Sequence, residues 1–456
     1  MRAQLAETIE AHIRFLTRAR SCAALTVVVS MFVSCPTSAF ASGLFLVKGA
    51  GWGNGVGMSQ WGAEGYALHG WDYHRILAHY YPHTTIGVVA QRTVRVLIAD
   101  KQPRISVGSA SPYLIVDGAG RRIHLRPQNL TLTPRLRLGE ALVPPVEIEA
   151  GAQPLTLDGK GYRGSFTVLR NDGRLSVVNT VPLERYLLGV VPEEMPRRWS
   201  IQAYAAQAVA ARSYALATLK PGASFDLYAD NRSQMYGGIS SEQPETNLAV
   251  GSTTGQVLTY AGQIITAYYD SNSGGRTAAV QDVFAGFRPQ PYLVSVSDPY
   301  DALSPFHRWR VAFSSSKLSA RFGMQVDDVR VQHNGSGVTD QVTLLGPKAQ
   351  KTMSGVEFSQ ALGLRSIRFS ISVASLAEPP AHVRKGRRLR LHGFLRDLGG
   401  VVLQQRLLDG SWRQVLRVRA RRDGRFEEWI RPRLGAAYRL AVDRAAGPAV
   451  EVSVER

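Results

Sequence analysis

The spacing of apolar and polar positions changes along the chain and predicts two kinds of structure. From residue 93 to about 165, short runs of alternating apolar and polar residues are broken by Gly, Pro and Asp, which is typical of β-strands. Residues 201–217 are rich in alanine and follow Ser200, an expected N-cap, so they predict a long and closely packed helix. The fold class is therefore expected to be α+β.

The end of the chain predicts a separate β domain. Residues 374–383 include a Pro-Pro pair and predict a linker. Residues 384–456 alternate apolar residues with arginine, the pattern of a small all-β sandwich with one solvated face. Six arginines of this sandwich are expected to face either anionic polymer or solvent: Arg387, Arg388, Arg417, Arg419, Arg421 and Arg422.

The first 41 residues predict an export signal. Arginines precede an apolar run that is too short for an ordinary membrane span, and small residues then favour cleavage after Ala41. A lipoprotein cleaved before Cys35 and an uncleaved anchor are the alternatives. Both cysteines, Cys22 and Cys35, lie in this segment, so the mature protein is expected to have no disulfide and no thiolate metal site. We expect export to the periplasm or to the cell wall and extracellular space.

The positive net charge of the chain indicates which kind of binding partner to expect. The formal net charge is +19, which in a cytosolic protein would suggest nucleic acid. For an exported protein we expect no nucleic acid, and instead anionic cell-wall polymers and glycan strands with acidic sugars. Hydrophobic residues make up 45% of the chain and charged residues 20%, which excludes general disorder.

A glycine-rich stretch, "GAGWGNGVGMSQW", occupies residues 49–61. A dinucleotide-binding site, a serine nucleophile and a metal site are three possible chemistries for this region, and the residues support none of them. It lacks a third glycine at Val56 for a dinucleotide fingerprint, and no second glycine follows Ser59 as a nucleophile elbow would need. The nearby histidines do not share one helical face, so no metal site is predicted there. No cofactor is expected.

Several separated blocks together carry a family resemblance. They are "LERYLLGVVPEEMPRRWSIQAYAAQAVAARSYAL" at 183–216, "QMYGG" at 234–238, "TNLAVGSTTGQVLTYAGQIITAYYDSNSGGRT" at 246–277, "PYLVSVSDPYD" at 291–301 and "LGLRSIRFSI" at 362–371. With the glycine-rich stretch, they cover most of residues 45–373. The chain resembles the SpoIID/LytB family of bacterial cell-wall proteins, which includes a sporulation lytic transglycosylase and amidase enhancers.

One block is out of order relative to that family. The glycine-rich block usually follows the equivalent of residues 362–371, whereas here it comes first. A circular permutation accounts for this, because the termini of a domain often lie close together. The expected division is then a permuted motif and helix at 42–91, a β-rich subdomain at 92–165 and a catalytic core at 166–373.

The resemblance implies cleavage of the bond between N-acetylmuramic acid and N-acetylglucosamine in peptide-stripped peptidoglycan, ending in a 1,6-anhydro sugar. The carboxyl group that matches the family's acid/base is Glu194. Its neighbour Glu193 is the competing candidate, because consecutive residues of an extended loop point opposite ways. The alternative function is a non-catalytic amidase enhancer or wall-binding protein, whose partner would be an N-acetylmuramoyl-L-alanine amidase.

The resemblance also implies supporting residues, each with an ordinary structural alternative. Gln207 and Arg212 match polar positions of the alanine-rich helix, and Asn54 stands where the family usually has histidine. Arg197 is a candidate for the carboxylate of muramic acid. The predicted glycan-binding residues are Gln207, Arg212, Tyr236, Ser273, Gly274, Gly275, Asn54, Gln60 and Arg197.

Overall fold

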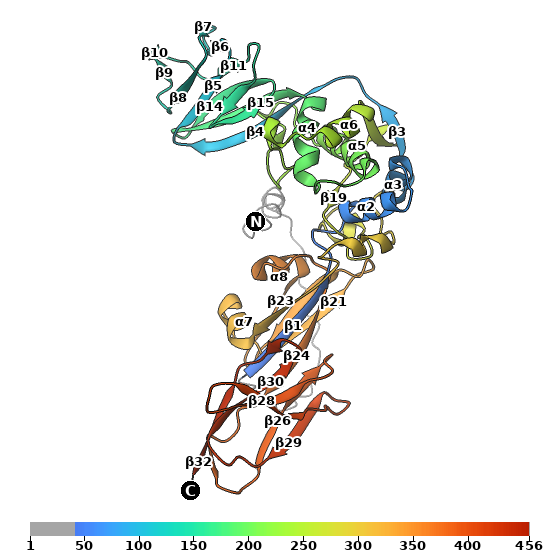
Figure 1. The fold of residues 1–456 in the computed structure, drawn as a ribbon, viewed down its shortest axis with the longest axis vertical. Helices are drawn as coiled ribbons and strands as arrows, with labels where there is room; N and C mark the ends of the chain where they lie inside the picture. The colour runs from blue at the N-terminus through green and yellow to red at the C-terminus, as the bar shows by residue number, and fades with distance from the viewer. Residues whose placement is uncertain (1–41, 456) are drawn as a thin grey trace, which may run out of the picture. The chain divides into compact units, whose positions relative to one another are not determined.

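The computed structural model describes residues 42–455 and divides them into two compact units (Figure 1). The first unit comprises residues 55–280 and 287–304; the second comprises 42–54, 281–286 and 305–455. The predicted signal segment lies outside the described residues. Helices and strands occur in both units, so the α+β class is confirmed. No helix in the described part of the chain is long and apolar enough to cross a membrane.

The helices of the first unit surround α5 (Ile201–Ala217), which packs against its four neighbours. Ser200 caps α5 by accepting a hydrogen bond from the backbone N–H of Gln202, as the sequence predicts. Every residue from Ala203 to Ala215 is buried, since small alanine side chains let other helices approach on all sides. The neighbours are α2 (Gln60–Leu68), α3 (Tyr73–Tyr80), α4 (Leu183–Glu194) and α6 (Pro244–Ser252).

Two larger sheets of the first unit account for the predicted alternating runs. In the seven-stranded sheet the order is β16 (Leu227–Tyr228), β4 (Thr93–Gln102), β15 (Arg174–Pro182), β14 (Ser165–Asn171), β11 (Val146–Glu149), β6 (Tyr113–Val116) and β7 (Arg122–Leu125). In the four-stranded sheet it is β13 (Lys160–Tyr162), β12 (Leu155–Leu157), β5 (Ile105–Ser109) and β8 (Gln128–Leu132). Because β15 runs directly into α4, the sheet fixes where α4 begins.

Short strands complete this unit and anchor the glycine-rich stretch. Strand β2 (Met58–Ser59) pairs in parallel with β19 (Tyr269–Asp270), and this pairing holds the start of α2. The remaining elements are β3 (Thr85–Val88), β9 (Arg137–Leu138), β10 (Glu140–Ala141), β17 (Gln256–Tyr260), β18 (Gln263–Ile264) and the 3₁₀ turns η1 (Gly238–Ser241) and η3 (Pro299–Leu303). A further turn, η2 (Val280–Asp282), spans the boundary between the two units.

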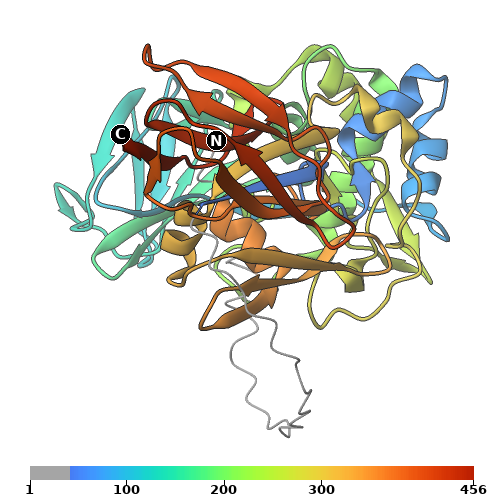
Figure 2. The ribbon, with the colours of Figure 1, turned by 90° about the horizontal axis from the view of Figure 1, so that it is seen from below.

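The second unit is built on a five-stranded sheet with β1 inside it. The order is β20 (Arg308–Ser314), β1 (Ser42–Ala50), β24 (Phe369–Leu376), β26 (Leu389–Arg396) and β29 (Arg425–Ile430). Successive residues of β1 point to opposite faces: Leu44 and Leu46 join one apolar core, and Phe45 and Val47 join the other. Figure 2 shows this blue strand among the orange and red strands.

The other elements of the second unit flank this sheet on its two apolar cores. A three-stranded sheet contains β21 (Asp328–His333), β22 (Thr339–Leu345) and β23 (Gln350–Ser354). A further sheet contains β25 (His382–Arg384), β32 (Val450–Glu455), β30 (Ala436–Val442), β27 (Val402–Arg406), β28 (Trp412–Arg417) and β31 (Ala445–Ala446). The helices are α7 (Ser315–Phe322) and α8 (Gly355–Leu362).

The structure differs from the predicted domain boundary at residues 374–383. Strand β24 continues to Leu376 and pairs with β26 on the far side of the predicted linker. One apolar core then joins β1 and β24 to the C-terminal strands. The expected separate sandwich at 384–456 is therefore not a separate body, because its core needs side chains from Leu44 and Leu46.

In the second unit, the residues that lead into the glycine-rich block lie beside the block at 362–371. Strand β1, which leads into this block, is antiparallel to β24, with Val47 opposite Ile371. The backbone N–H of Gly53 also donates to the carbonyl of Arg365 at 3.1 Å. Residues 42–54 thus lie where a chain leaving the block 362–371 would continue, as a permutation requires, and the permutation itself stays a prediction.

We predict that Gly57→Ala destabilises the first unit by on the order of 3 kcal/mol, more than a left-handed backbone alone would cost. Gly57 has φ +78°, and an added Cβ would overlap the carbonyl oxygen of Tyr268. Gly70→Ala is the matched control, because φ is +81° there and nothing lies within 4 Å of the added atom. Urea unfolding of both variants measures the difference; equal losses would contradict the prediction.

Candidate functional site

Glu194 and Glu193 are the last two residues of α4, not part of an extended loop as expected. They still point in different directions, because consecutive helical residues are about 100° apart. The backbone N–H of Met235 donates to Glu194 Oε1 at 2.8 Å. The carboxylate of Glu193 instead accepts a hydrogen bond from the hydroxyl of Ser241. The two carboxyl groups therefore have different partners and separate environments.

Burial is the main reason that the carboxyl group of Glu194 is a weaker acid than an exposed glutamate. Although the residue keeps partial exposure, loss of water around its carboxyl group raises the pKa to about 7. The charge of Glu193 adds to this increase, while hydrogen bonds from Met235, Gln60 and Tyr269 oppose it. The position at the C-terminal end of a helix also disfavours a negative charge. The result is a carboxyl group that can both give and take a proton near neutral pH.

The glycine-rich stretch contributes Gln60 to the surroundings of Glu194. Gln60 is the first residue of α2, is 5% exposed, and places its Nε2 3.5 Å from Glu194 Oε2. Its helix begins at Ser59, whose hydroxyl accepts from the backbone N–H of Gly62 at 3.0 Å. The structure thus brings together two predicted residues that are 134 positions apart in the sequence.

Three tyrosines that the sequence analysis did not single out face Glu194. They are Tyr186 of α4, Tyr214 of α5 and Tyr269 of β19, and the pKa of each is raised, chiefly by burial, with the nearby Glu194 charge adding to it. Gln234 links two of them: it accepts from Tyr186 at 3.2 Å and donates to Tyr269 at 2.8 Å. All lie within the family blocks, but aromatic residues there are equally typical of a core.

Arg212 has a structural environment that differs from the predicted glycan contact. Its side chain is fully buried and makes a two-point ion pair with Glu184, at 2.8 Å from Nε and 2.7 Å from Nη2. A further N–H donates to the carbonyl of Gln256 at 3.0 Å. The guanidinium therefore ties α5 to the start of α4 and to β17, and its donors face protein groups.

Gln207 and Tyr236 are also buried away from solvent. Gln207 is 0% exposed, one helical turn before Ala211, and neither atom of its amide has a hydrogen-bond partner. The hydroxyl of Tyr236 donates to Asn179 at 3.0 Å, and its ring packs between Tyr162 and Tyr186. For Tyr236 this packing favours a core role over the predicted lining of a cleft.

Ser273, Gly274 and Gly275 wrap around a buried carboxylate. The backbone N–H groups of Gly274 and Gly275 donate to Asp301 Oδ2 at 2.6 and 3.0 Å. The hydroxyl of Ser273 donates to Asp298 at 2.7 Å. Burial and the charge of Asp301 raise the pKa of Asp298 to about 6. The donors of Ser273, Gly274 and Gly275 thus bind a buried acidic pair, which favours the ordinary structural role over a glycan contact.

The remaining two predicted contacts are Arg197 and Asn54. Arg197 is exposed, three residues after Glu194. Asn54 belongs to the second unit and Glu194 to the first. Their roles in binding glycan stay predictions.

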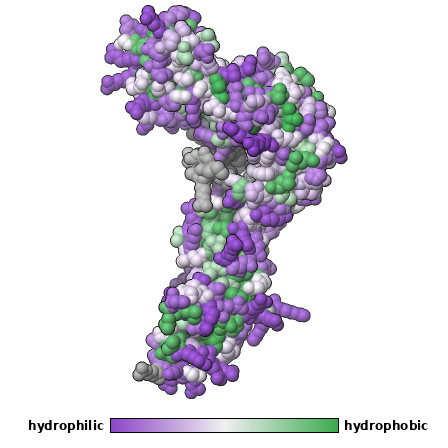
Figure 3. Space-filling view, viewed as in Figure 1, coloured by the Kyte–Doolittle hydropathy of each residue, from purple (hydrophilic) through white to green (hydrophobic). Residues whose placement is uncertain are grey.

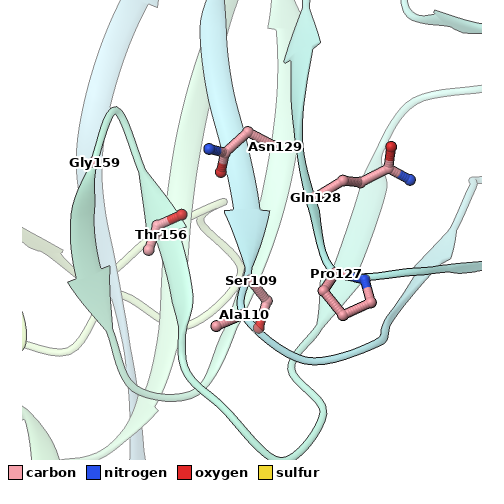
Figure 4. A pocket seen from close by; sticks show the side chains of 7 residues that line it. All are labelled: Ser109, Ala110, Pro127, Gln128, Asn129, Thr156 and Gly159. Carbon is pink, nitrogen blue, oxygen red and sulfur yellow. The ribbon is translucent and has the colours of Figure 1, made fainter.

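Two further features lie outside the Glu194 cluster. Among residues 42–455, no group of three or more His, Cys, Asp or Glu side chains could hold a metal ion. An open hollow of about 410 Å³ occurs on the four-stranded sheet of the first unit (Figure 4). It is lined by Ser109, Ala110, Pro127, Gln128, Asn129, Thr156 and Gly159, none of them a predicted site residue.

A family model and individual relatives both point to the same family of proteins. Residues 171–260 match the family model described as stage II sporulation protein, SpoIID, a stretch that includes Glu194. Over 214 residues the chain is 34% identical to an amidase enhancer of Bacillus subtilis, covering 46% of this chain and 29% of that protein. Over 217 residues it is 29% identical to stage II sporulation protein D of Bacillus subtilis, covering 42% of this chain and 61% of that protein.

A third relative is an uncharacterized protein of Brachyspira hyodysenteriae, 34% identical over 144 residues, covering 31% of this chain and 39% of that protein. The SpoIID family model matches part of the chain, and the resemblance of the chain to the SpoIID/LytB family is confirmed. The alignments span less than two thirds of each of these relatives.

We predict that Arg212→Met lowers the free energy of unfolding by about 3–5 kcal/mol, because it removes a fully buried guanidinium and leaves the partly buried carboxylate of Glu184 without its ion-pair partner. Arg197→Met, at an exposed position, is expected to change it by less than about 0.5 kcal/mol. Urea unfolding compares the two variants. Wild-type stability in Arg212→Met would contradict the structural role.

A second prediction concerns how Glu194 makes stability depend on pH. Its pKa is about 7 in the folded chain and close to 4.5 when exposed, so the folded state holds this proton more tightly. Its stabilising contribution is therefore full below about pH 4.5 and is lost as the pH rises towards 7. Glu194→Gln removes this pH-dependent loss of stability. Its free energy of unfolding at high pH is expected to exceed that of wild type by up to roughly 3 kcal/mol.

Thermal unfolding of both proteins at about pH 5 and about pH 8 measures this difference. Glu193→Gln is the matched control, since that neighbouring carboxylate is exposed. If the Glu194→Gln and wild-type stabilities change in parallel with pH, Glu194 does not have the raised pKa.

Proposed function

We propose that this protein is an exported, peptidoglycan-acting lytic transglycosylase. It cleaves the bond between N-acetylmuramic acid and N-acetylglucosamine in peptide-stripped glycan strands and leaves 1,6-anhydro ends. The observation that carries the proposal is the carboxyl group of Glu194, partly exposed as a residue yet with a pKa of about 7. Similarity to stage II sporulation protein D and to an amidase enhancer supports a role at the cell wall.

One carboxyl group is sufficient for this reaction. Protonated Glu194 gives its proton to the glycosidic oxygen as the bond from that oxygen to C1 breaks. The 6-hydroxyl of the same muramic acid forms the new bond to C1, and its proton passes to the Glu194 carboxylate. The acid is thereby restored, and no water or second carboxylate takes part, unlike an ordinary glycosidase.

The environment of Glu194 suits both steps, proton donation to the glycosidic oxygen and proton uptake from the 6-hydroxyl. A general acid/base works best when its pKa is near the working pH, since both protonation states are then populated. Near neutral pH, Glu194 has comparable populations of acid and carboxylate. Glu193 is a weaker candidate, because it is exposed and its carboxylate already accepts from Ser241.

The charge of the chain supports an acidic substrate or neighbour. The net charge is +19, and Arg197 and Arg198 are exposed, three and four residues after Glu194. Muramic acid without its stem peptide has a free carboxylate, which an arginine binds well. The six arginines near the end of the chain that are expected to face anionic polymer or solvent are also exposed. On the face in Figure 3, hydrophilic residues are interspersed with hydrophobic ones over the second unit.

The second candidate function is an amidase enhancer that binds glycan and recruits an N-acetylmuramoyl-L-alanine amidase without cutting the strand. The 34% identity to an amidase enhancer favours it. Asn54 favours it too, because an amide cannot act as an acid or base where the family usually has histidine.

The test is mass spectrometry of products from peptide-stripped and intact glycan strands after incubation with the purified protein. We expect anhydro-ended fragments from stripped strands, and a loss of about a hundredfold to ten-thousandfold in Glu194→Gln. Glu193→Gln is the matched control and is expected to keep most of the activity. Bound but uncut glycan with wild type would overturn the transglycosylase, and stimulation of an added amidase would then support the enhancer.

A further inference from the structure

Two partly exposed tryptophans pack against each other in the first unit, close to Glu194. Trp61 follows Gln60 in α2, and the Nε2 atom of Gln60 lies 3.5 Å from Glu194 Oε2. Trp199 lies in the loop between α4, which ends at Glu194, and α5. The centroids of the two indole rings are 4.8 Å apart, and the ring planes are inclined by 69°. Two segments far apart in the sequence thus bring aromatic surface close to the same carboxyl group.

The loop that carries Trp199 is held in place by hydrogen bonds to two helices. The hydroxyl of Tyr204, in α5, accepts from the backbone N–H of Trp199 at 3.0 Å and donates to the carbonyl of Pro196 at 2.8 Å. The backbone N–H of Ser200 donates to Glu64 Oε2, in α2, at 2.8 Å. These contacts fix the position of the loop tryptophan relative to both helices.

The same loop contains a residue with an unfavourable backbone conformation. Arg198 has φ +66°, in the left-handed region that disfavours residues with a Cβ. Such a conformation persists only where the surrounding structure fixes it, and it occurs often at functional sites. Arg197 and Arg198 are exposed, and Trp199 beside them is partly exposed. The loop therefore presents cationic and aromatic side chains next to each other.

The tryptophan pair differs in burial from two tyrosines around Glu194. Tyr186 and Tyr214 are buried, whereas Trp61 and Trp199 each keep part of their surface exposed. A hexopyranose ring has C–H groups on its apolar face, and this face fits against the flat surface of an aromatic ring. Sites for small ligands combine such aromatic surface with a few polar groups that fix the orientation of the ligand. The carboxyl group of Glu194 and the exposed arginines of the loop are polar groups of this kind.

We propose that the tryptophan pair, Trp61 and Trp199, is a sugar-binding platform that holds one N-acetylhexosamine ring of a glycan strand beside Glu194. The inference rests on the proposed function, since it takes glycan as the ligand. The indole rings require no charge on the sugar, while Arg197 and Arg198 add a contact for the carboxylate of a stripped muramic acid. The platform therefore binds neutral oligomers of N-acetylglucosamine as well as peptide-stripped strands.

The test measures binding of a short neutral oligomer of N-acetylglucosamine by isothermal titration calorimetry, in the full chain with Glu194→Gln so that no cutting occurs. We expect Trp61→Leu and Trp199→Leu each to raise the Kd about tenfold to a hundredfold. Trp199→Phe keeps an aromatic ring and is expected to restore much of the affinity. The matched control is Trp429→Leu, since Trp429 is 53% exposed and belongs to the second unit.

A second measurement needs no variant and applies even if the leucine variants do not fold. N-Bromosuccinimide oxidises accessible indole rings, and peptide mass spectrometry locates each oxidised tryptophan. The bound oligomer is expected to protect Trp61 and Trp199 and to leave the oxidation of Trp429 unchanged. Equal oxidation of the pair with and without the oligomer would overturn the proposal, as would unchanged affinity in both leucine variants.

These outcomes separate the platform from the proposed reaction. If the wild-type protein binds the oligomer through the tryptophan pair but cuts no stripped glycan, the platform stands and the transglycosylase fails. If the protein cuts glycan while neither tryptophan contributes to binding, the reaction stands and the platform fails. Absence of any binding to the neutral oligomer would also overturn the platform.

Discussion

The burial of one carboxyl group at the end of α4 is the constraint on which the site depends. A carboxylate there has lost water and lies at the negative end of a helix, so it is stable only while several donors point at it. Those donors come from separate parts of the first unit: Met235 lies in a loop and Gln60 in α2. Each must be held by other contacts, and this explains the dense packing around the carboxyl group.

Much of that packing depends on α5. Its alanines allow four helices to approach, and two of its polar groups then fix elements near the site. Arg212 bonds Glu184 at the start of α4, and the carbonyl of Ala211 fixes the amide of Gln234. The guanidinium of Arg212 and the amide of Gln234 are fully buried, so they influence the site through the position of α4 and the orientation of Gln234. Arg212 and Gln234, which lie at polar positions of the family blocks, can therefore support the site by positioning other residues, without contacting a substrate.

The sequence was sufficient for features that depend on local rules. The cap at Ser200 and the alternating strands follow from residue types and are confirmed. The choice of Glu194 follows from one family block and stays a prediction. Gln60 was also expected near the site, and its contact with Glu194 agrees. The tyrosine cluster was missed, because Tyr186, Tyr214 and Tyr269 meet only through long-range packing. The boundary at 374–383 was misplaced, since a Pro-Pro pair signals a turn but cannot show that β1 from the other end of the chain completes the core.

A raised pKa alone would not have identified Glu194. Asp298 also has a pKa above its usual range, at about 6, yet it is 0% exposed. Its two oxygens accept from Tyr80 and Ser273 at 2.7 Å each, so neither is free to meet a sugar. Glu194 differs in keeping partial exposure while its carboxyl group is desolvated. An acid/base needs both a shifted pKa and access to the substrate, and of these two carboxyl groups only Glu194 combines them.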